Sequence, residues 1–297
     1  MRRRHRLVPW LYLTPALLLV GVFVYYPVID NFRLSLYAWS AFSPRPTWVG
    51  VSNYQKLMGD PVFWSSLLNN TYYAIVSVAF QVGLGLVIAA VLEETLVRRL
   101  RVFFRTVYFI PAVVSITVVG LLFQTLYDPK MGLIDQFLVT IGRGSWTHAW
   151  LGEAGTAIWS IIAMSQWQYT GYITLLFVVA IQKIPHELYE SAAIDGASRF
   201  RAFVHVTVPL VREMTLLALI ITISGAYMVF NEVMVTTQGG PDNASHVLST
   251  WLYQSAFLND QMGYASTIAA VIFVVTFTLA VIQLTLARSG RDEASAT

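Results

Sequence analysis

The segment HELYESAAIDGASRFRAFVHVTVPL, residues 186–210, is a polar interval between two long apolar runs. Glu187 and Glu190 stand in the first turns of a short predicted helix, where the positive end of the helix dipole stabilises acidic side chains. Asp195 and Gly196 then end that helix, because glycine readily adopts the left-handed conformation that other residues avoid. The Asp-Gly pair therefore predicts a sharp turn in the middle of the segment.

A second short helix is predicted after this turn. Ser198 is a suitable N-cap, and Pro209 marks the entry to the next apolar run. Apolar residues recur between them at helical spacing, at Phe200, Phe203, Val204 and Val208. Ala192 and Ala193 give the first helix a small, flat face suited to a groove in a partner protein. Residues 183–212 are thus predicted to form a helix-turn-helix, and an ordinary amphipathic loop at the membrane surface is the alternative that the residues leave open.

The chain around this segment has the composition of an integral membrane protein. Of its 297 residues, 56% are hydrophobic and only 12% are charged. A membrane-spanning helix needs about 20 apolar residues, and continuous apolarity favours helices over the alternating pattern of a β-barrel. Six uncharged runs meet this requirement: residues 7–29, 61–92, 106–127, 155–182, 214–231 and 261–287. We therefore expect an all-α protein with one transmembrane domain over residues 1–297.

The basic residues predict the orientation of these six runs. Segments on one side carry Arg2, Arg3, Arg4, Arg6, Arg98, Arg99, Arg101, Arg105, Lys183, Arg199, Arg201, Arg212, Arg288 and Arg291. Segments on the other side carry only Arg33, Arg45, Lys56, Lys130 and Arg143. Because basic residues concentrate on the cytoplasmic side, both termini and the polar segment are expected there. No small-residue cleavage pattern follows the first run, which favours an uncleaved first helix.

Several classes of function find no support in the sequence. The lysines, in QKL, PKM and QKI, do not belong to a phosphate-binding P-loop, so the chain is not expected to bind ATP itself. HELYE lacks the second histidine of a zinc-protease motif, and there is no G-x-S-x-G motif. The chain has no cysteine and its five histidines are scattered, so no metal site is expected. The net charge of +3 follows the membrane topology and does not indicate nucleic-acid binding.

Polar side chains within the apolar runs are candidates for a transport path, because such groups are costly in lipid. The second run contains Asn70, Tyr73, Ser77 and Gln81, and the third contains Gln124. The fourth contains Gln166, Tyr169 and Thr170, and the fifth contains Ser224, Tyr227 and Asn231 at helical spacing. Hydrogen bonds between helices are the alternative use of every one of these residues. Glu232 is expected at the outer end of the fifth run, exposed to solvent.

The polar segment closely resembles the EAA loop of permease subunits of ATP-binding-cassette (ABC) importers, in the form found among carbohydrate-uptake permeases. In that family the loop forms a coupling helix that docks into the ATPase subunit. The matching residues here are Glu190, Ala192, Ala193, Asp195, Gly196 and Pro209. Ser191 departs from the pattern, since the family more often has alanine there, and we expect this small residue to permit docking.

The resemblance extends along nearly the whole chain. LTPALLLVGVFVYYPVIDNFRLSLY and YFIPAVVSITVVGLLFQTLYDPKMGLID are similar to the first helix and the third helix with its loop in MalF-type members, and VTTQGGPDNAS to the external segment before the last helix. The resemblance implies a six-helix, MetI-like permease of the prokaryotic cytoplasmic membrane. The implied partners are a MalG-type permease, two ATPase subunits that bind ATP and magnesium, and an extracytoplasmic solute-binding protein, and no cofactor is expected in this chain.

The expected substrate is a neutral disaccharide or oligosaccharide, moved by alternating access. No basic residue lies inside the six runs, whereas a phosphate or carboxylate would normally meet one. Glutamine, asparagine and tyrosine offer the neutral hydrogen-bonding groups that a sugar needs. The expected contacts are Gln166, Tyr169, Tyr227 and Asn231, with Thr170, Gln124 and Ser77 along the path. A glycerol-phosphate permease and a self-sufficient secondary transporter remain alternatives, the latter disfavoured because the centres of the runs are uncharged.

Overall fold

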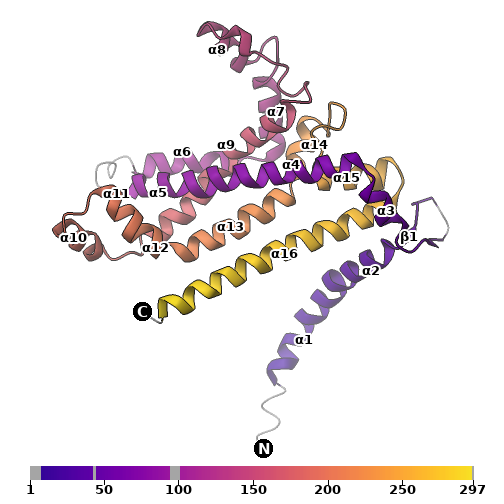
Figure 1. Ribbon diagram of the computed structural model, residues 1–297, viewed down its shortest axis with the longest axis horizontal. Helices are drawn as coiled ribbons and strands as arrows, with labels where there is room; N and C mark the ends of the chain where they lie inside the picture. Colours follow the sequence, from indigo (N-terminus) through magenta and orange to yellow (C-terminus); the bar gives the residue numbers. More distant parts are fainter. Residues whose placement is uncertain (1–7, 43–44, 94–100, 296–297) are drawn as a thin grey trace, which may run out of the picture. The chain divides into compact units, whose positions relative to one another are not determined.

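The computed structural model describes residues 8–42, 45–93 and 101–295, and this part of the chain is largely helical (Figure 1). One short antiparallel hairpin pairs β1 (Tyr37–Ala38) with β2 (Thr47–Trp48). The chain divides into two compact units. The first contains Met1–Asp60 and Leu252–Val274, and the second contains Pro61–Trp251 and Val275–Thr297.

The first unit begins with a continuous helical path through α1 (Val8–Val20), the π-helical η2 (Gly21–Tyr25) and α2 (Tyr26–Leu34). The predicted run of residues 7–29 stops at the first charge, Asp30, and its first residue lies outside the described part. The helix nevertheless continues to Leu34, and within it Asp30 pairs with Arg33 one turn later, at 2.8 Å from Arg33 Nε to Asp30 Oδ1. Charged residues thus extend this helix past its apolar portion.

The remainder of the first unit packs against α2. It consists of α3 (Ser52–Met58), η7 (Gln254–Leu258) and the beginning of α16 (Met262–Ser295). Asn31 Nδ2 donates to the carbonyl of Ser266 at 3.2 Å, and the rings of Phe32 and Phe273 meet edge to face at 5.6 Å. At Gly263 a side chain would overlap the carbonyl of Tyr37, so only glycine permits this approach.

The second unit is a helical bundle. Its first elements are α4 (Pro61–Ser77), η3 (Val78–Leu84), α5 (Gly85–Glu93), α6 (Arg101–Val113), α7 (Ile116–Leu126), α8 (Leu133–Thr140), η5 (Gly144–Trp146) and α9 (Ala157–Ile181). They are followed by α10 (His186–Ile194), α11 (Arg199–Ala202), η6 (Phe203–Thr207), α12 (Val208–Leu210), α13 (Arg212–Tyr227), α14 (Asn231–Thr236) and α15 (Leu248–Tyr253), whose last two residues belong to the first unit.

Helix α9 is the centre of this bundle and packs against η3, α5, α6 and α13. A buried apolar cluster joins these elements, made of Val82, Leu86, Ala89, Ile173, Phe177, Val178, Ile181, Val211 and Ala218. A side chain at Gly171 would overlap the carbonyl of Tyr108, so α6 approaches the backbone of α9 directly. This close packing fixes α9 as one wall of the site described below.

Three helical stretches of the described chain are long and apolar enough to cross a membrane: Tyr12–Leu34, Pro61–Glu93 and Met262–Thr285. Two bent pairs raise this number to five if each pair is one span, namely Val102–Val113 with Ile116–Leu126, and Arg199–Leu210 with Arg212–Tyr227. Helix α9 has 25 residues, but the glutamines and hydroxyl-bearing residues at its centre lower its hydropathy. The count of six spans therefore stays a prediction.

Two predicted runs are broken in the structure, and their treatment as single helices is wrong. The run of residues 106–127 bends by 97° between α6 and α7, where Ser115 has an extended ψ of 134°. The run of residues 214–231 ends at Tyr227, because Phe230 leaves the helical conformation before α14 begins. Apolarity persists through both breaks, so run length does not reveal them.

Candidate functional site

A cavity of about 640 Å³ lies within the second unit. Its walls come from α4, η3, α6, α9 and α13, together with residues 228–230 and the first residues of α14. Five of the polar residues that the sequence indicated line it: Tyr73, Ser77, Gln81, Tyr169 and Asn231. The structure therefore brings candidates from three of the predicted runs to one place.

Gln166 lies behind this lining and links two of its residues, Ser77 and Gln81, by hydrogen bonds. Gln81 Nε2 donates to Gln166 Oε1 at 3.0 Å, and Gln166 Nε2 donates to Ser77 Oγ at 3.1 Å and to the carbonyl of Ile162 at 3.0 Å. Both glutamines are 7% exposed. Because each amide group is held by a neighbour, the network fixes the orientation of the Ser77 and Gln81 side chains in the wall.

Four polar residues of the lining were not among the sequence candidates: Ser165, Tyr172, Thr222 and Glu232. The hydroxyl of Thr222 is buried and forms no hydrogen bond with any described residue, while those of Tyr73 and Ser165 are buried beside each other. Buried polar groups normally have a partner, so the Thr222 hydroxyl is available to a polar ligand or to water. No sequence pattern singles out one serine or threonine of an apolar run as a cavity residue.

Glu232 corrects one of the predictions. It was expected to be solvated, but it is only 8% exposed and lines the cavity, where Tyr169 OH donates to Glu232 Oε1 at 3.2 Å. The early end of α13 explains the difference, since the chain turns at Phe230 and brings Glu232 back towards α9. The sequence signal that could have indicated this position was an ionisable residue at the end of an apolar run.

Most of the other sequence candidates with a hydrogen bond hold helices together outside the cavity lining. Gln124 Nε2 donates to the carbonyls of Val235 and Thr236 in α14. The hydroxyls of Tyr227 and Thr71 are 3.2 Å apart, and Thr170 Oγ1 donates to the carbonyl of Gln166. Similarly, Asn70 donates to Ala226 O and accepts from Leu248 N. Helix-to-helix hydrogen bonding, the alternative use of these residues, describes the contacts of Gln124, Tyr227 and Asn70, whereas the bond of Thr170 lies within α9.

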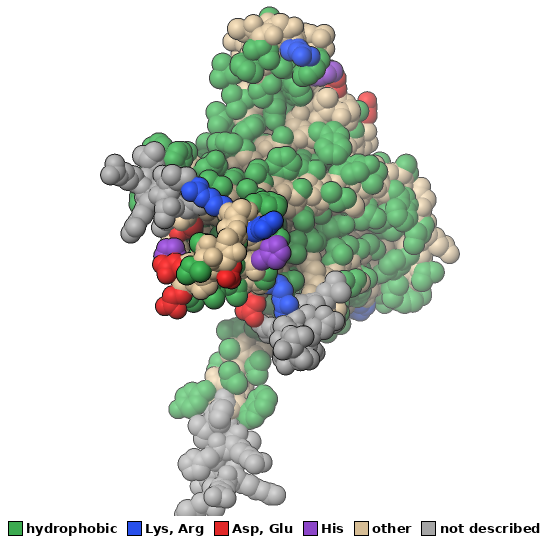
Figure 2. All heavy atoms as spheres, turned by 60° about the vertical axis from the view of Figure 1, so that its left-hand side comes forward, with side chains coloured by type: hydrophobic (Ala, Val, Ile, Leu, Met, Phe, Trp, Pro, Cys, Tyr) green, Lys and Arg blue, Asp and Glu red, His purple; other side chains and the backbone are tan. Residues whose placement is uncertain are grey.

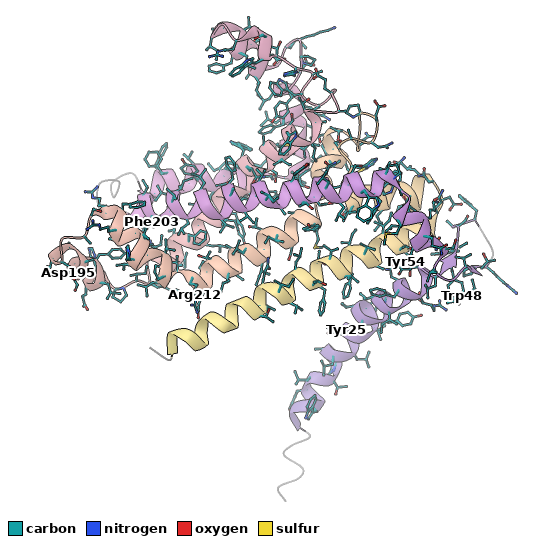
Figure 3. The ribbon with its side chains drawn as sticks, viewed as in Figure 1. Tyr25, Trp48, Tyr54, Asp195, Phe203 and Arg212 are labelled. Carbon is teal, nitrogen blue, oxygen red and sulfur yellow. The ribbon has the colours of Figure 1, made fainter. Side chains whose placement is uncertain are left out.

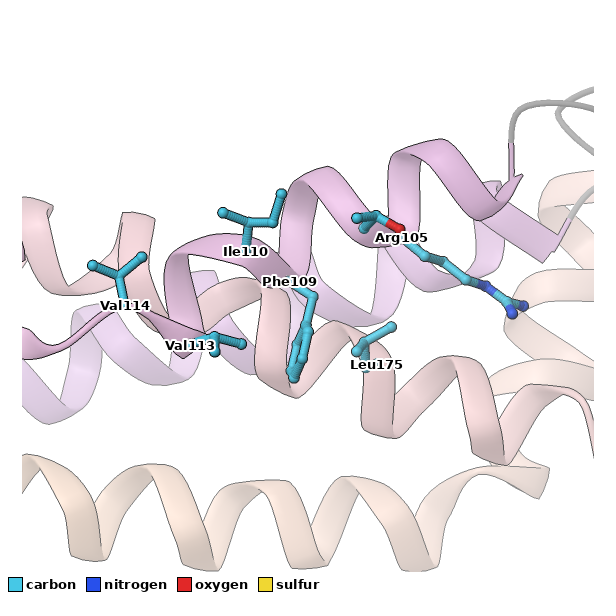
Figure 4. Close-up of a pocket in the computed structure, with 7 residues that line it drawn as sticks. Arg105, Phe109, Ile110, Val113, Val114 and Leu175 are labelled. Atoms are coloured by element: carbon cyan, nitrogen blue, oxygen red, sulfur yellow. The ribbon is translucent and has the colours of Figure 1, made fainter.

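A second hollow of about 450 Å³ adjoins the cavity at Phe109, which lines both. Figure 4 shows Phe109, Ile110, Val113, Val114 and Leu175 around it, with Arg105 at one end. The guanidinium of Arg105 pairs with Glu93, so the wall is mostly apolar. The hollow lacks the dense hydrogen-bonding groups of the larger cavity, which is therefore the candidate binding site.

The lining of the larger cavity carries one carboxylate, Glu232, and three tyrosines. No lysine or arginine lines it, and no group of three possible metal ligands occurs among the described residues. Aromatic rings of Tyr73, Tyr169 and Tyr172 alternate with hydroxyl and amide groups. Such a lining is suited to a ligand that forms hydrogen bonds and also presents apolar faces.

The polar segment forms the predicted turn at the opposite end of the second unit from α14 (Figure 1). After α10, Gly196 has φ of +76°, and its N–H donates to the carbonyl of Ala193 at 3.1 Å. Ala197 N–H donates to the carbonyl of Ala192 at 2.9 Å, which completes a Schellman motif. Ser198 Oγ accepts from Arg201 N at 3.3 Å, so the predicted N-cap is confirmed.

The turn is an exposed feature. Glu190, Ala193, Asp195 and Gly196 are exposed and Ala192 is half-buried, while Figure 3 shows Asp195 at the far tip. Figure 2, which brings this end forward, shows charged side chains gathered there. Two large apolar side chains are also exposed, Ile194 at 87% and Phe200 at 74%.

The second half of the polar segment is tied to the first. Tyr189 OH and Thr207 Oγ1 are 2.9 Å apart, which links α10 to η6. Pro209 lies in α12, and the chain bends by 71° before α13. The exposed turn thus continues directly into α13, which carries Thr222 of the cavity.

These features define a membrane-embedded helical permease with an internal polar cavity. Residues 81–289 match the family described as the inner membrane component of binding-protein-dependent transport systems. The chain belongs to this family. The all-α, MetI-like permease fold expected from the sequence is therefore confirmed.

Individual relatives match over almost their whole length. YurN of Bacillus subtilis, described as a probable ABC transporter permease, is 49% identical over 99% of this chain and 100% of the relative. The trehalose/maltose permease MalF of Thermococcus litoralis is 32% identical, and the lactose permease LacF of Rhizobium radiobacter is 31% identical. Each of these two matches covers 98% of this chain and 97% of the relative.

Solved structures match the fold at lower sequence identity. A chain of a bacterial ABC transporter that imports the acidic polysaccharide alginate has a TM-score of 0.82 at 21% identity, with 96% of each chain covered. A chain of the alginate transporter in complex with its pentasaccharide-bound periplasmic protein has a TM-score of 0.83 at 20% identity, also with 96% of each chain covered. These matches establish a common architecture for the permease chain.

Proposed function

We propose that this chain is the MalF-type permease subunit of an ABC importer and that it moves a neutral disaccharide or oligosaccharide by alternating access. The observation that carries the proposal is the cavity lined by hydroxyls, amides and tyrosine rings, without a basic side chain. A sugar ring offers hydroxyls to such groups and an apolar face to the rings. The names of the lactose and trehalose/maltose permeases among the relatives support the same substrate class.

The proposed contacts are the cavity residues Ser77, Tyr169 and Asn231, with Gln166 behind the wall. Tyr227 and Gln124 contribute by holding the helices that form the cavity, and Thr170 lies on the same helix as Gln166. A glycerol-phosphate substrate fits less well, because its anionic group would meet Glu232 and no lysine or arginine.

The proposed partners follow from the exposed turn and the family. Glu190, Ala192, Ala193, Asp195 and Gly196 would dock into one of two ATPase subunits, which bind ATP and magnesium, and Pro209 would stand at the link to α13. The protrusion of the Schellman turn supports this role. A MalG-type permease would complete the path, and a solute-binding protein would deliver the sugar. This chain is assigned no catalytic residue, cofactor or metal.

The proposed location is a prokaryotic cytoplasmic membrane with both termini on the cytoplasmic side. The basic residues support this orientation, although Arg2, Arg3, Arg4, Arg6, Arg98 and Arg99 lie outside the described residues. A reporter fused after Thr297 would then be cytoplasmic, and one inserted at Asn243 would be external.

A self-sufficient secondary transporter is the competing function, and Glu232 is the observation that favours it, since ion-coupled carriers use buried carboxylates. The test is uptake by proteoliposomes that contain this chain, its paired permease, its ATPase subunits and its binding protein. We expect uptake of a neutral sugar from a panel that includes lactose, trehalose and maltose, and only with ATP inside. Uptake by this chain alone under an ion gradient, or uptake of phosphorylated solutes only, would overturn the proposal.

A further inference from the structure

Glu232 is the charged residue of the cavity. The other residues of the lining carry hydroxyl, amide, aromatic or aliphatic groups, so no lysine or arginine of the described chain faces the carboxylate there. Glu232 is 8% exposed, and Tyr169 OH donates the side-chain hydrogen bond that it receives. The cavity therefore presents one negative charge that a basic neighbour does not neutralise.

This carboxylate stands where a ligand would pass. Asn231 and Phe230 beside it also line the cavity, as do Tyr73 and Tyr169 on α4 and α9. Thr236 Oγ1 donates to the backbone carbonyl of Glu232, which holds the main chain of α14 and leaves the carboxylate to the cavity.

We propose that Glu232 determines the charge selectivity of the transport path, accepting hydrogen bonds from the hydroxyls of a neutral sugar and excluding sugars that carry a carboxylate. The inference rests on the proposed sugar-import function and extends it by naming the residue that rejects acidic sugars. Two negative charges in a cavity of low dielectric constant repel each other more strongly than in water, whereas a sugar hydroxyl donates to a carboxylate in a strong, charge-assisted hydrogen bond. A single carboxylate therefore has opposite effects on the two substrate classes.

The test measures dissociation constants by calorimetry on the assembled importer without its binding protein, so that only the selectivity of the membrane subunits is read. Lactose, trehalose and maltose are the neutral probes. For each sugar that binds, the acidic probe is the analogue with one CH₂OH oxidised to a carboxylate. A third probe is the methyl ester of that acid, which restores neutrality but is larger than the acid.

We expect the wild-type importer to bind the neutral sugar at least about tenfold more tightly than the acid. The methyl ester should bind almost as tightly as the neutral sugar. Glu232→Gln should reduce the preference about tenfold. Glu153→Gln is the matched control, because it removes the charge of an exposed carboxylate outside the cavity lining, and its preference should stay close to that of the wild type.

The measurements distinguish failure of the Glu232 inference from failure of the proposed import function. Equal binding of sugar and acid by the wild type, a weak ester, or an unchanged preference in Glu232→Gln would overturn the role of Glu232 while the importer still binds neutral sugars. If Glu232→Gln does not assemble, the wild type still tests rejection by charge: weaker binding of the acid than of the ester supports it, and equal binding overturns it. Failure of every sugar to bind, together with failure of ATP-dependent sugar uptake, would instead overturn the proposed function.

Discussion

Gln81 and Gln166 join η3 to α9 through a direct hydrogen bond between their amide groups, 3.0 Å from Gln81 Nε2 to Gln166 Oε1. Gln166 also donates to Ser77 at the end of α4, so one side chain connects three elements. The two glutamines are nearly fully buried, and Ser77 is 1% exposed. The polar wall of the cavity is therefore a connected structure whose parts depend on one another.

Replacement of Gln166 by leucine should destabilise the assembled importer. The change leaves the amide of Gln81 and the hydroxyl of Ser77 without their partner inside the protein, which costs about 1–3 kcal/mol for an unsatisfied buried group. Thermal unfolding of the purified complex measures this loss, and the affinity for sugar should fall with it because Gln81 and Ser77 line the cavity.

Gln136→Leu provides the control for this change. Gln136 is an exposed residue of α8, and its amide donates only to the nearby carbonyl of Met131. The same substitution there should leave thermal stability and sugar binding close to the wild-type values. Equal stability of the two variants would show that the glutamine network does not support the cavity.

Replacement of Gly196 by leucine should weaken the association of the ATPase subunit more than it weakens membrane insertion. Gly196 has φ of +76°, a conformation that costs a non-glycine residue about 1–3 kcal/mol, and its surface faces open space where a partner would dock. Co-purification with the ATPase and sugar-stimulated ATP hydrolysis should both decrease.

Gly142 offers a closely matched control for the backbone effect. It has φ of +77° and also faces open space, but it lies in the loop between α8 and η5. Gly142→Leu should therefore impose similar strain without reducing ATPase association. Normal association in Gly196→Leu, or equal losses in both variants, would contradict docking at the turn.

The turn was predictable because it depends on neighbouring residues in the sequence. The cavity was not, because it depends on the tertiary packing of distant segments. Gly196 and Ser198 have roles set by residues within a few positions, and their predicted turn and cap occur in the structure. The end of α13 at Tyr227 is invisible in an apolar run that continues to Asn231, so the helical spacing assigned to these two residues is wrong. The same break brings Glu232 to the cavity. The length of the apolar run alone had predicted that Glu232 is exposed to solvent.

The loop between α14 and α15 should open in mild acid. His246 is 3% exposed, and its burial lowers the imidazole pKa from about 6.5 to about 4. Between these values the unfolded loop binds a proton that the folded loop does not, so stability falls as the pH decreases from 6.5 towards 4 and then levels off. Hydrogen exchange of residues 237–250 should therefore be faster at pH 5 than at pH 7, beyond the intrinsic effect of pH.

Two variants isolate the histidine. His246→Asn removes the titrating group, so the acid-dependent part of the opening should disappear even if the loop is less stable overall. His148→Asn changes an exposed histidine in another loop and should preserve the acid response of residues 237–250. Retention of the full response in His246→Asn would assign the opening to a different group.

Thr222 should affect ligand binding and folding in opposite ways. Its hydroxyl lines the cavity, is buried, and forms no hydrogen bond within the described chain. Thr222→Val keeps the shape of the side chain and removes a group that is costly to bury, so thermal stability should stay equal or rise. If the hydroxyl binds sugar, its loss should weaken the affinity about twofold to tenfold, the range for one hydrogen bond of roughly 0.5–1.5 kcal/mol.

Thr207→Val is the reciprocal control for Thr222→Val. Thr207 is also buried, at 3% exposed, but its hydroxyl lies 2.9 Å from Tyr189 OH in the polar segment and outside the cavity lining. This variant should lose thermal stability, because the hydroxyl of Tyr189 loses its partner, and should retain the sugar affinity of the wild type. Calorimetric titration and thermal unfolding of the two assembled variants give the four required values. An unchanged sugar affinity in Thr222→Val would show that the unpaired hydroxyl is not part of the binding surface.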